Sequence, residues 1–409
     1  MMAEPMVKQV RPDVESFARI RVVGVGGSGG NTINHMVSTH VVGVDFLAVN
    51  TDAQDLAKSK SKRKIHIGRN LTRGLGTGMD PDLGKQAAEE TREEIQEALK
   101  GSDMVFVTCG MGGGTGTGAA PAVARIAREL GALTVGVVTK PFGFEGAQRS
   151  RLADQGIMEL RKSVDAIIVI PNDKLLSIVS KETGIKNAFA MCDDILKQAV
   201  EGISDLITTT GIINVDFADV RTIMHNAGSA LMGIGTAIGE KRAETAARLA
   251  INSPLLDVSI HGAKGVLFSV AGGEDLGMLE VQEAANAITE AIDPEAKVIF
   301  GAVTDDTLKK GQIKVTVIAT GFPENLPGGR IMPTPVGTPR LSKREPDTMP
   351  PIRKNPIDLS AAAEKPTPPS PPPREKEKEA PPQRSDMPRS ADDTDDDVWG
   401  GFPSFLRRK

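Results

Sequence analysis

Short runs of apolar residues recur along the first half of the chain, and stretches with helical spacing separate them. Each run is nearly all apolar and rich in β-branched residues, which is typical of a strand buried on both faces of a parallel sheet. The runs begin near residues 19, 44, 64, 104, 133 and 165. We therefore expect an α/β fold with a parallel Rossmann-like sheet, whose ligands bind at the carboxyl ends of the strands.

A long helix is predicted from 186 to 208, because Ile195, Ala199, Ile203 and their apolar neighbours form one stripe along it. Another helix is expected at 81–99, where a run of glutamates indicates a solvated face. A second, smaller α/β region should follow, with strands near 230–235, 265–270, 298–303 and 313–318 and helices near 241–251 and 276–291. It shows no catalytic or metal-binding cluster, so we expect it to serve packing and assembly.

The composition changes after residue 322. Residues 326–409 hold 18 of the 27 prolines, mixed with charged residues. Such a segment can bury too little apolar surface to offset the conformational entropy that it would lose on folding. It is therefore predicted to be a disordered linker. The last residues, 398–409, combine Trp399 and two phenylalanines with a basic end, which is typical of a docking peptide that folds on a partner.

The overall composition narrows the class of protein further. A net charge of −4 gives no basic field, which argues against nucleic acid as the main partner. The two cysteines, Cys109 and Cys192, lack the spacing of metal ligands. We expect them to pack as small apolar side chains in a protein of a reducing compartment. No run reaches eighteen apolar residues and no apolar signal core is present, so a cytoplasmic protein is expected.

A glycine-rich segment between a predicted strand and a predicted helix carries the clearest chemistry. Six of the nine residues from Gly110 to Gly118 are glycine, so backbone N–H groups can approach an anion closely while a helix N-terminus adds positive potential. Thr115 and Thr117 add hydroxyl groups. The segment is not a Walker A motif, because no lysine follows its last glycine. These features predict a phosphate site held mainly by backbone amides.

Two further glycine segments flank this one in sequence. Residues 24–31 contain G-x-G-x-x-G, and Asp52 follows the next strand, as a dinucleotide-binding protein would require. An NAD(P)-dependent oxidoreductase therefore remains an alternative on these residues. It leaves the glycines of 112–118 unexplained. The third segment, 71–81, is also rich in glycine and suits a loop that changes shape.

The sequence GGGTGTG at Gly112–Gly118 resembles the signature of the tubulin/FtsZ family of GTPases, and the likeness extends from about residue 17 to 322. The resemblance implies GTP and Mg²⁺, with the metal held mainly through phosphates and water rather than by protein ligands. It also implies a set of nucleotide-binding residues. They are Gly26, Gly27, Ser28, Asn31, Asn50, Asp52, Gly76, Thr77, Gly78, Gly112, Gly113, Gly114, Thr115, Gly116, Thr117, Gly118, Glu145, Arg149, Asn172, Phe189 and Asp193.

Phe189 and Asp193 lie four residues apart on one face of the long helix. A carboxylate can accept both donors on the guanine edge at once, whereas adenine offers no such donor pair. The resemblance puts Phe189 on the face of the base, Asn172 and Asp193 on its edge, and Glu145 with Arg149 near the sugar. Alternatives remain for each role: Phe189 as core, Glu145–Arg149 as a surface pair, and Asp52 as a helix cap.

Asp216 and Asp219 stand three apart at the entry to a further helix, after Asn214. Helix capping would explain both acids on stability grounds. The resemblance instead implies that this loop enters the phosphate pocket of the next subunit, where Asp216, Asp219 and Asn214 form the catalytic group. GTP hydrolysis would then depend on head-to-tail assembly. A filament that binds nucleotide without hydrolysing it is the remaining alternative.

The resulting division of the chain is a disordered arm (1–17), a GTP-binding domain (18–185), a central helix (186–208), an assembly and activation domain (209–325), a linker (326–397) and a partner-binding peptide (398–409). The resemblance implies a homopolymer at the mid-cell division site. It also implies FtsA-, ZipA-, SepF- or MinC-like partners for the peptide. Neither nucleic acid nor membrane insertion is expected.

Overall fold

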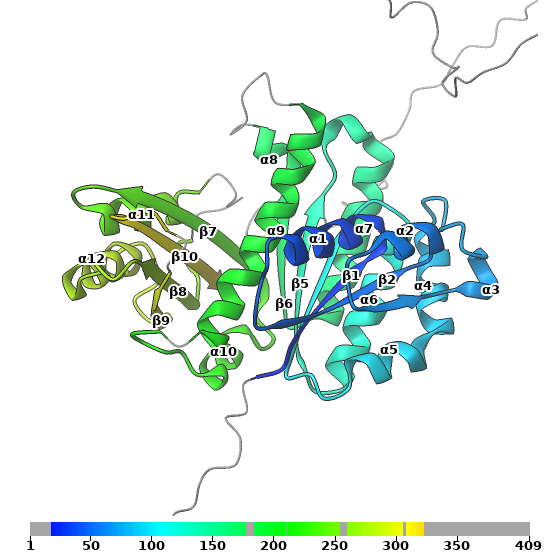
Figure 1. Cartoon of the computed structure of the whole chain (residues 1–409), viewed down its shortest axis with the longest axis horizontal. Coiled ribbons are helices and arrows are strands. Elements are labelled where there is room, and N and C mark those ends of the chain that lie inside the picture. The colour runs from blue at the N-terminus through cyan, green and yellow to red at the C-terminus, as the bar shows by residue number, and fades with distance from the viewer. Residues whose placement is uncertain (1–17, 177–183, 210, 254–259, 306–307, 323–409) are drawn as a thin grey trace, which may run out of the picture. The chain divides into compact units, whose positions relative to one another are not determined.

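A computed structural model of the chain describes residues 18–176, 184–209, 211–253, 260–305 and 308–322. The predicted arm, linker and C-terminal peptide therefore lie outside the described residues. Ten strands form one sheet in the order β3-β2-β1-β4-β5-β6-β7-β10-β8-β9 (Figure 1). The first six are β1 (Ile20–Val25), β2 (Val44–Asn50), β3 (Arg63–His66), β4 (Met104–Gly110), β5 (Leu133–Lys140) and β6 (Ala166–Pro171).

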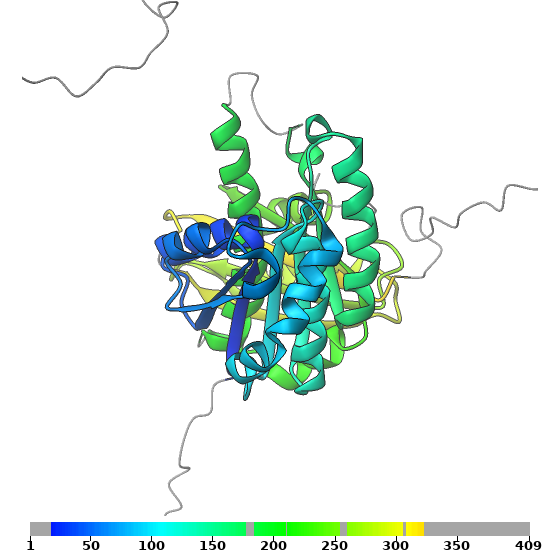
Figure 2. The same ribbon diagram turned by 90° about the vertical axis from the view of Figure 1, so that its right-hand side faces the viewer.

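These six strands are mutually parallel, as the apolar runs predict. Alternate residues enter different cores, because successive side chains of a strand point to opposite faces. Val22 of β1 lies in the core beneath α1 (Gly26–Ser38) and α9 (Ile185–Thr208), whereas Val23 lies in the core beneath the helices of the opposite face. Figure 2 shows these two layers of helices on either side of the strands.

The opposite face is covered by α4 (Pro81–Glu90), α5 (Arg92–Leu99), α6 (Thr115–Glu129) and α7 (Ala147–Ser163). The single helix expected at 81–99 is wrong, because Thr91 interrupts it with φ −108° and ψ 22°. The Thr91 hydroxyl donates to the Ala87 carbonyl at 3.2 Å and accepts from the Gly68 amide at 3.2 Å. The bond to a carbonyl four residues earlier also occurs within unbroken α1, so the contact from the Gly68 amide, outside the helix, is what distinguishes Thr91.

Shorter elements complete this region: α2 (Ala53–Lys58), α3 (Arg69–Thr72), the single turn η1 (Gly143–Glu145) and α8 (Asn172–Leu176). Both glycine loops are shorter than the sequence suggests. The helix after β1 already begins at Gly26, and the helix after β4 begins at Thr115. The second half of GGGTGTG is therefore the first turn of α6.

The second region contains α10 (Phe217–Met224), β7 (Gly228–Ile238), α11 (Arg242–Ile251), β8 (Gly265–Gly272), α12 (Met278–Thr289), β9 (Lys297–Thr304) and β10 (Gln312–Thr320). Strand β10 is antiparallel to β7 and β8, while β9 is parallel to β8. Arg242 joins α11 to α12, since its guanidinium reaches Glu280 at 2.6 Å and Asp275 at 2.7 Å. No helix among the described residues is long and apolar enough to cross a membrane.

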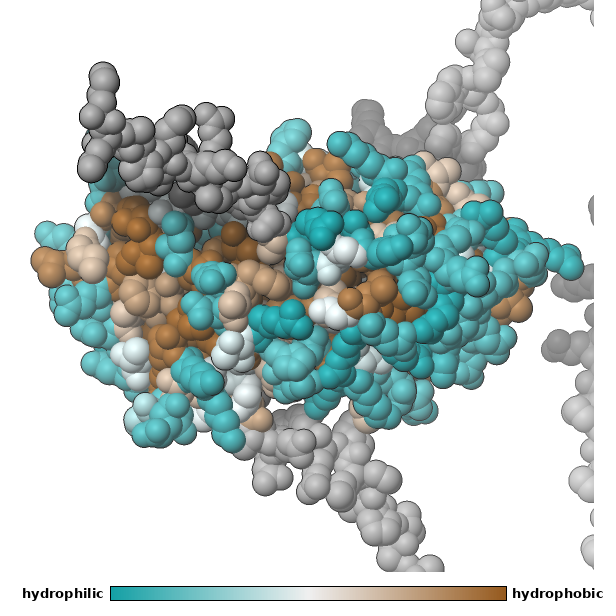
Figure 3. All heavy atoms as spheres, turned by 90° about the horizontal axis from the view of Figure 1, so that it is seen from below, coloured by the Kyte–Doolittle hydropathy of each residue, from teal (hydrophilic) through white to brown (hydrophobic). Residues whose placement is uncertain are grey.

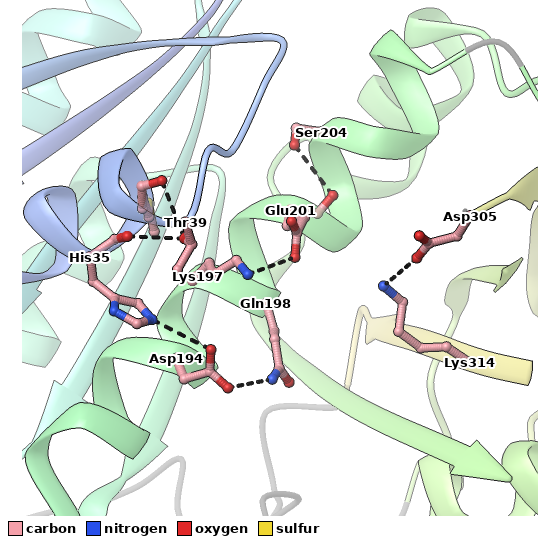
Figure 4. Close-up of polar contacts among 10 residues, drawn as sticks. His35, Thr39, Asp194, Lys197, Gln198, Glu201, Ser204, Asp305 and Lys314 are labelled. Carbon is pink, nitrogen blue, oxygen red and sulfur yellow. Dashed lines mark hydrogen bonds and ion pairs between the residues drawn. The ribbon is translucent and has the colours of Figure 1, made fainter. Parts of the chain in front are cut away.

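Helix α9 lies beside β10 of the second region. A Cβ at Gly202 would lie 2.9 Å from the Thr316 methyl group, so the glycine permits this close packing. Asp205 follows on the same helix, and burial raises the pKa of its carboxyl to about 7. Glu201 and Asp305 add to the rise, while Lys314 and Lys197 oppose it. Figure 4 shows Lys314 with its partner Asp305, at 3.4 Å, near this part of α9.

Asp205→Asn should stabilise the fold at neutral and alkaline pH. The folded-state pKa of about 7 exceeds the ordinary 3.8, so wild-type stability falls as pH rises from about 4 to about 7 and then levels off. The neutral amide avoids this loss, and the gain should reach on the order of 2–4 kcal/mol above pH 7. Thermal unfolding of both proteins across this pH range measures it. A difference in Tm that does not change with pH would show that Asp205 ionises normally.

Candidate nucleotide-binding site

The six parallel strands have the order 3-2-1-4-5-6, and the order reverses between β1 and β4. In open α/β sheets, ligands bind outside the carboxyl ends of the strands at such a switch point. Helices α1 and α6 both begin there, directly after β1 and a few residues after β4. Their free N–H groups and dipoles supply an anion-binding environment on adjacent strands.

Glycine is required where these helix starts meet. Gly26 has φ +73°, and a Cβ on it would lie 3.0 Å from the Gly116 amide nitrogen. Within the GGGTGTG segment, the Gly112 amide donates to the Thr117 hydroxyl at 2.9 Å, which closes the turn. Gly118 has a different role, because a Cβ there would lie 1.8 Å from the Pro81 carbonyl oxygen. That glycine allows α6 to pack against α4.

Thr115 connects the central loop with two other loops. Its hydroxyl lies 2.7 Å from the Thr51 hydroxyl and 3.3 Å from the Thr77 hydroxyl. Thr77 stands between Gly76 and Gly78, which both have positive φ. The three glycine segments predicted from the sequence therefore meet, directly or through neighbouring residues, around one place.

A cleft of 400 Å³ opens beside Thr115. Its lining consists of Gly27, Asn50, Asp52, Gln54, Asp55, Lys58, Gly76 and Thr115. Asp52 also caps α2, accepting from the Gln54 amide at 2.9 Å and the Asp55 amide at 3.0 Å. The capping alternative and the position beside the cleft are both observed. Neighbouring Gly27, Ser28 and Asn31 lie in the first turns of α1 with exposed side-chain positions.

Asn50 and Asp55 form a hydrogen-bonded pair in this cleft. The Asn50 amide donates to the Asp55 carboxylate at 2.7 Å. Burial raises the pKa of Asp55, and the nearby charge of Asp52 raises it further. Two crowded carboxylates with an amide oxygen suit a hard cation such as Mg²⁺. Among the described residues no three His, Cys, Asp or Glu side chains converge as a complete metal site, so phosphate and water would have to supply the remaining ligands.

Three phenylalanines form an aromatic cluster after the end of β5. Phe142 is buried and stacks on Phe144 with ring centroids 5.0 Å apart. Phe189 of α9 meets Phe142 edge to face at 5.3 Å and keeps 42% of its surface exposed. A phenylalanine serving as ordinary core would be more buried than this. The exposed ring face is suited to stack against a planar base.

Two polar residues predicted to bind the base, Asn172 and Asp193, lie on α8 and α9. Asn172 begins α8 with 5% exposure, and its side-chain oxygen has no hydrogen-bond partner within the described structure. A buried amide oxygen without a partner is costly, which suggests that a ligand donor completes it. Asp193 lies one turn after Phe189 on α9. Burial raises the pKa of its carboxyl, while a hydrogen bond from Thr32 and the nearby His35 oppose the rise.

Glu145 and Arg149 form an ion pair four residues apart at the start of α7. Glu145 also accepts a bond from the Phe142 amide at 2.9 Å. The Arg149 carbonyl contacts the central loop, since a Cβ at Gly112 would lie 2.7 Å from its oxygen. The ion pair is therefore observed, although the Glu145 side chain is only 14% exposed and the pair is not fully on the surface. The same pair links Phe142 of the aromatic cluster to the glycine loop at Gly112.

Asn214, Asp216 and Asp219 do not lie with the residues above. Helix α9 carries the chain roughly 22 Å from Asp193 to Thr208 at 1.5 Å per residue, and the three residues follow beyond its end (Figure 1). Asp216 caps α10 weakly, accepting from the Ala218 amide at 3.4 Å. Asn214 accepts from the Gly211 amide at 2.6 Å. All three side chains are exposed.

Sequence reasoning missed several residues of the site. Thr51, Asp55, Phe142 and Thr32 each contact a predicted residue, yet none stands in a glycine motif. Asp55 could have been found, because it lies in the first turn of the short helix that Asp52 caps. The two cysteines lie nearby and are buried, and burial raises the pKa of each thiol to about 12.

A sheet with this strand order and glycine-rich helix starts at its switch point defines a nucleotide-binding α/β protein. Residues 19–180 match the GTPase domain of the Tubulin/FtsZ family, and residues 228–323 match the C-terminal domain of the FtsZ family. The chain belongs to the tubulin/FtsZ family, and it is a GTPase. The resemblance proposed from GGGTGTG is thus confirmed, and the oxidoreductase alternative is excluded.

Solved structures agree with this assignment. An empty FtsZ dimer from M. jannaschii is 48% identical, with a TM-score of 0.72, over 75% of this chain and 89% of that one. CetZ2 from Haloferax volcanii, in a GTPγS-bound protofilament, is 23% identical with a TM-score of 0.64, over 74% of this chain and 92% of that one. CetZ1 from the same organism, a GDP-bound monomer, is 23% identical with a TM-score of 0.65, over 76% and 96%. At this identity the CetZ proteins support the fold alone.

Gly114→Ala should destabilise the protein without any nucleotide present. A Cβ at Gly114 would lie 2.1 Å from the Thr77 hydroxyl and 2.8 Å from the Asp80 backbone, so the loop before α4 must move. Overpacking of this kind costs about 1–3 kcal/mol. Gly113→Ala is the matched control, because no atom lies within 4 Å of its new Cβ. Equal Tm values for the two variants would contradict the packing described here.

Proposed function

We propose that the chain assembles head to tail into a filament and that GTP is hydrolysed between two subunits. The separation of two residue groups carries this proposal. The residues predicted to bind the nucleotide lie at the carboxyl ends of the strands and near the start of α9, whereas Asp216 and Asp219 follow the far end of α9. Since the two groups lie apart in one chain, a second copy would have to bring the acids to the phosphates.

Exposed apolar residues at both places support a contact between unlike surfaces. Leu75 and Phe144, on loops near the nucleotide site, are 82% and 65% exposed. Ile212 near Asn214, and Val298 and Phe300 on the outermost strand β9, are also exposed. Figure 3 shows apolar residues gathered over the half of one face that holds the second region. Two different surfaces that fit each other form a contact that does not close on itself, which favours a filament.

In the proposed mechanism the amide groups of α1 and α6 hold the phosphates in line for attack. Glu145 and Arg149 bind the sugar region, and Phe189, Asn172 and Asp193 bind guanine. Mg²⁺ bound through the phosphates would neutralise developing negative charge, with Asn50, Asp52 and Asp55 offering oxygen atoms to its shell.

The neighbouring subunit would contribute Asp216 and Asp219, whose carboxylates orient and polarise the attacking water. Asn214 would hold the loop that carries them through its bond to Gly211. Assembly thereby completes the active site, and hydrolysis can weaken the contact that completed it.

We further propose that the filament acts in the cytoplasm as a division ring at mid-cell. Its C-terminal peptide, 398–409, would bind membrane-tethering and regulatory proteins of the FtsA, ZipA, SepF or MinC kind. The apolar and basic composition of this peptide supports such docking. The domain division predicted from the sequence belongs to the same proposal, with the first domain ending at 185 and the central helix at 208.

Specific GTPase activity should rise with protein concentration. Below a threshold, monomers lack the partner's acids and activity per molecule should be close to zero. Above it, each added molecule should contribute a constant increment, because it joins a filament end. Phosphate release across a dilution series, with light scattering on the same samples, measures both activity and assembly. Activity per molecule that is independent of concentration would rule out a shared active site.

Asp219→Ala should bind GTP normally and still assemble, yet lose about 100-fold in hydrolysis, which is typical for removal of a water-orienting group. Glu93→Ala is a suitable control, because Glu93 is also an exposed acid in the first turn of a helix, α5. The control should hydrolyse GTP like the wild type. Loss of GTP binding by the Asp219→Ala protein would refute the assignment.

A further inference from the structure

Thr32 of α1 connects the helix that begins at the phosphate loop with the helix that carries Asp193. Its side chain is fully buried, and its hydroxyl donates to one carboxylate oxygen of Asp193 at 2.8 Å. The same hydroxyl lies 3.1 Å from the carbonyl of Ser28, four residues earlier in α1. Thr32 therefore stands between the first turn of α1 and the carboxylate of Asp193.

A hydroxyl group has one hydrogen to donate, so these two acceptors compete. The Asp193 oxygen is closer and carries charge, and hydrogen bonds to charged acceptors are the stronger ones. The hydrogen is thus directed to Asp193 while that carboxylate is ionised. One of its oxygens is then fixed, and the second oxygen keeps both of its acceptor sites.

We propose that Thr32 is a positioning residue for guanine recognition: its hydroxyl fixes one oxygen of Asp193 so that the carboxylate faces both donors of the base edge. The inference rests on the proposed role of Asp193 in binding guanine. Phe189 lies one turn before Asp193 on the same face of α9. Its ring would stack on the base and so keep the base edge directed at the Asp193 carboxylate. A carboxylate that accepts two parallel bonds, one at each oxygen, must lie in the plane of the base.

The electrostatics of Asp193 support this role. Burial raises the pKa of its carboxyl, and the Thr32 hydrogen bond opposes the rise, which favours the charged form that accepts both donors. A simple tether between the helices is the competing explanation. A separate polar contact also links these two helices, because His35 of α1 lies 3.5 Å from Asp194 of α9 (Figure 4). The two contacts can be removed separately.

The test compares the affinities of GTP and ITP, because inosine lacks only the exocyclic amino group of guanine. The dissociation constants are measured on the full chain below its assembly threshold for the wild type, Thr32→Val, Thr32→Ser and Asp193→Asn. A bond to a charged group contributes about 1.5–3 kcal/mol, so the wild type should prefer GTP by about tenfold or more. Thr32→Val should reduce this preference to about threefold or less, and Thr32→Ser should retain it.

Two controls separate positioning from packing and tethering. Thr108→Val removes a buried hydroxyl that has no partner among the described residues, and it should leave the preference unchanged. Asp194→Ala removes the contact with His35, the other polar contact described between α1 and α9, while leaving His35 near Asp193. It should also leave the preference unchanged. If Thr32→Val does not fold, Thr32→Ala makes the same comparison.

The outcomes distinguish this inference from the function on which it rests. Loss of the preference in Asp193→Asn but not in Thr32→Val would overturn the role of Thr32 and leave the guanine site standing. An unchanged preference in Asp193→Asn would overturn both. Equal losses in Thr32→Val and Asp194→Ala would show that Thr32 acts as a tether between the helices and overturn the proposal.

Discussion

The structure depends on how closely backbone can approach backbone at the switch point of the sheet. Helices α1 and α6 begin side by side there, and Gly26 of one faces the Gly116 amide of the other at a distance that leaves little room for a side chain. Two helix starts at this spacing concentrate N–H groups on one small volume. Such an arrangement can attract an anion without the lysine of a Walker A motif.

The same constraint extends away from the nucleotide site. Gly118 allows α6 to contact α4, and Gly24 faces Gly29 so that α1 packs tightly against its own strand. Glycines that resemble phosphate ligands in the sequence thus divide into two groups in the structure. Some line the site, and others fix the helices that present it. A substitution in either group would impair binding for different physical reasons.

The sequence was sufficient for the sheet, since parallel buried strands leave unbroken apolar runs that few other structures produce. It was also sufficient for the family, through GGGTGTG. The break at Thr91 was not predictable, because it depends on the Gly68 amide, twenty-three residues earlier in the chain. Helix starts were placed too late, because glycine is usually taken to indicate a loop even where a helix begins.

Contacts between distant segments were equally hidden. The hydrogen bond from Thr32 to Asp193 joins residues 161 positions apart, and no motif or periodicity in the sequence predicts it. The four-residue spacing on one helix places Phe189 and Asp193 on the same face. It could not reveal that Phe142 packs against the ring of Phe189. What the sequence lacked was the packing of α1 against α9.

The burial of both native thiols has a practical consequence. The chain contains two cysteines, and neither Cys109 nor Cys192 ionises readily, so a maleimide reagent that needs a thiolate has no ready target among them. A single cysteine introduced on an exposed helix face would become the reactive site for a fluorophore or spin label. The natural sequence can thus serve as the background for labelling experiments without first replacing its own cysteines.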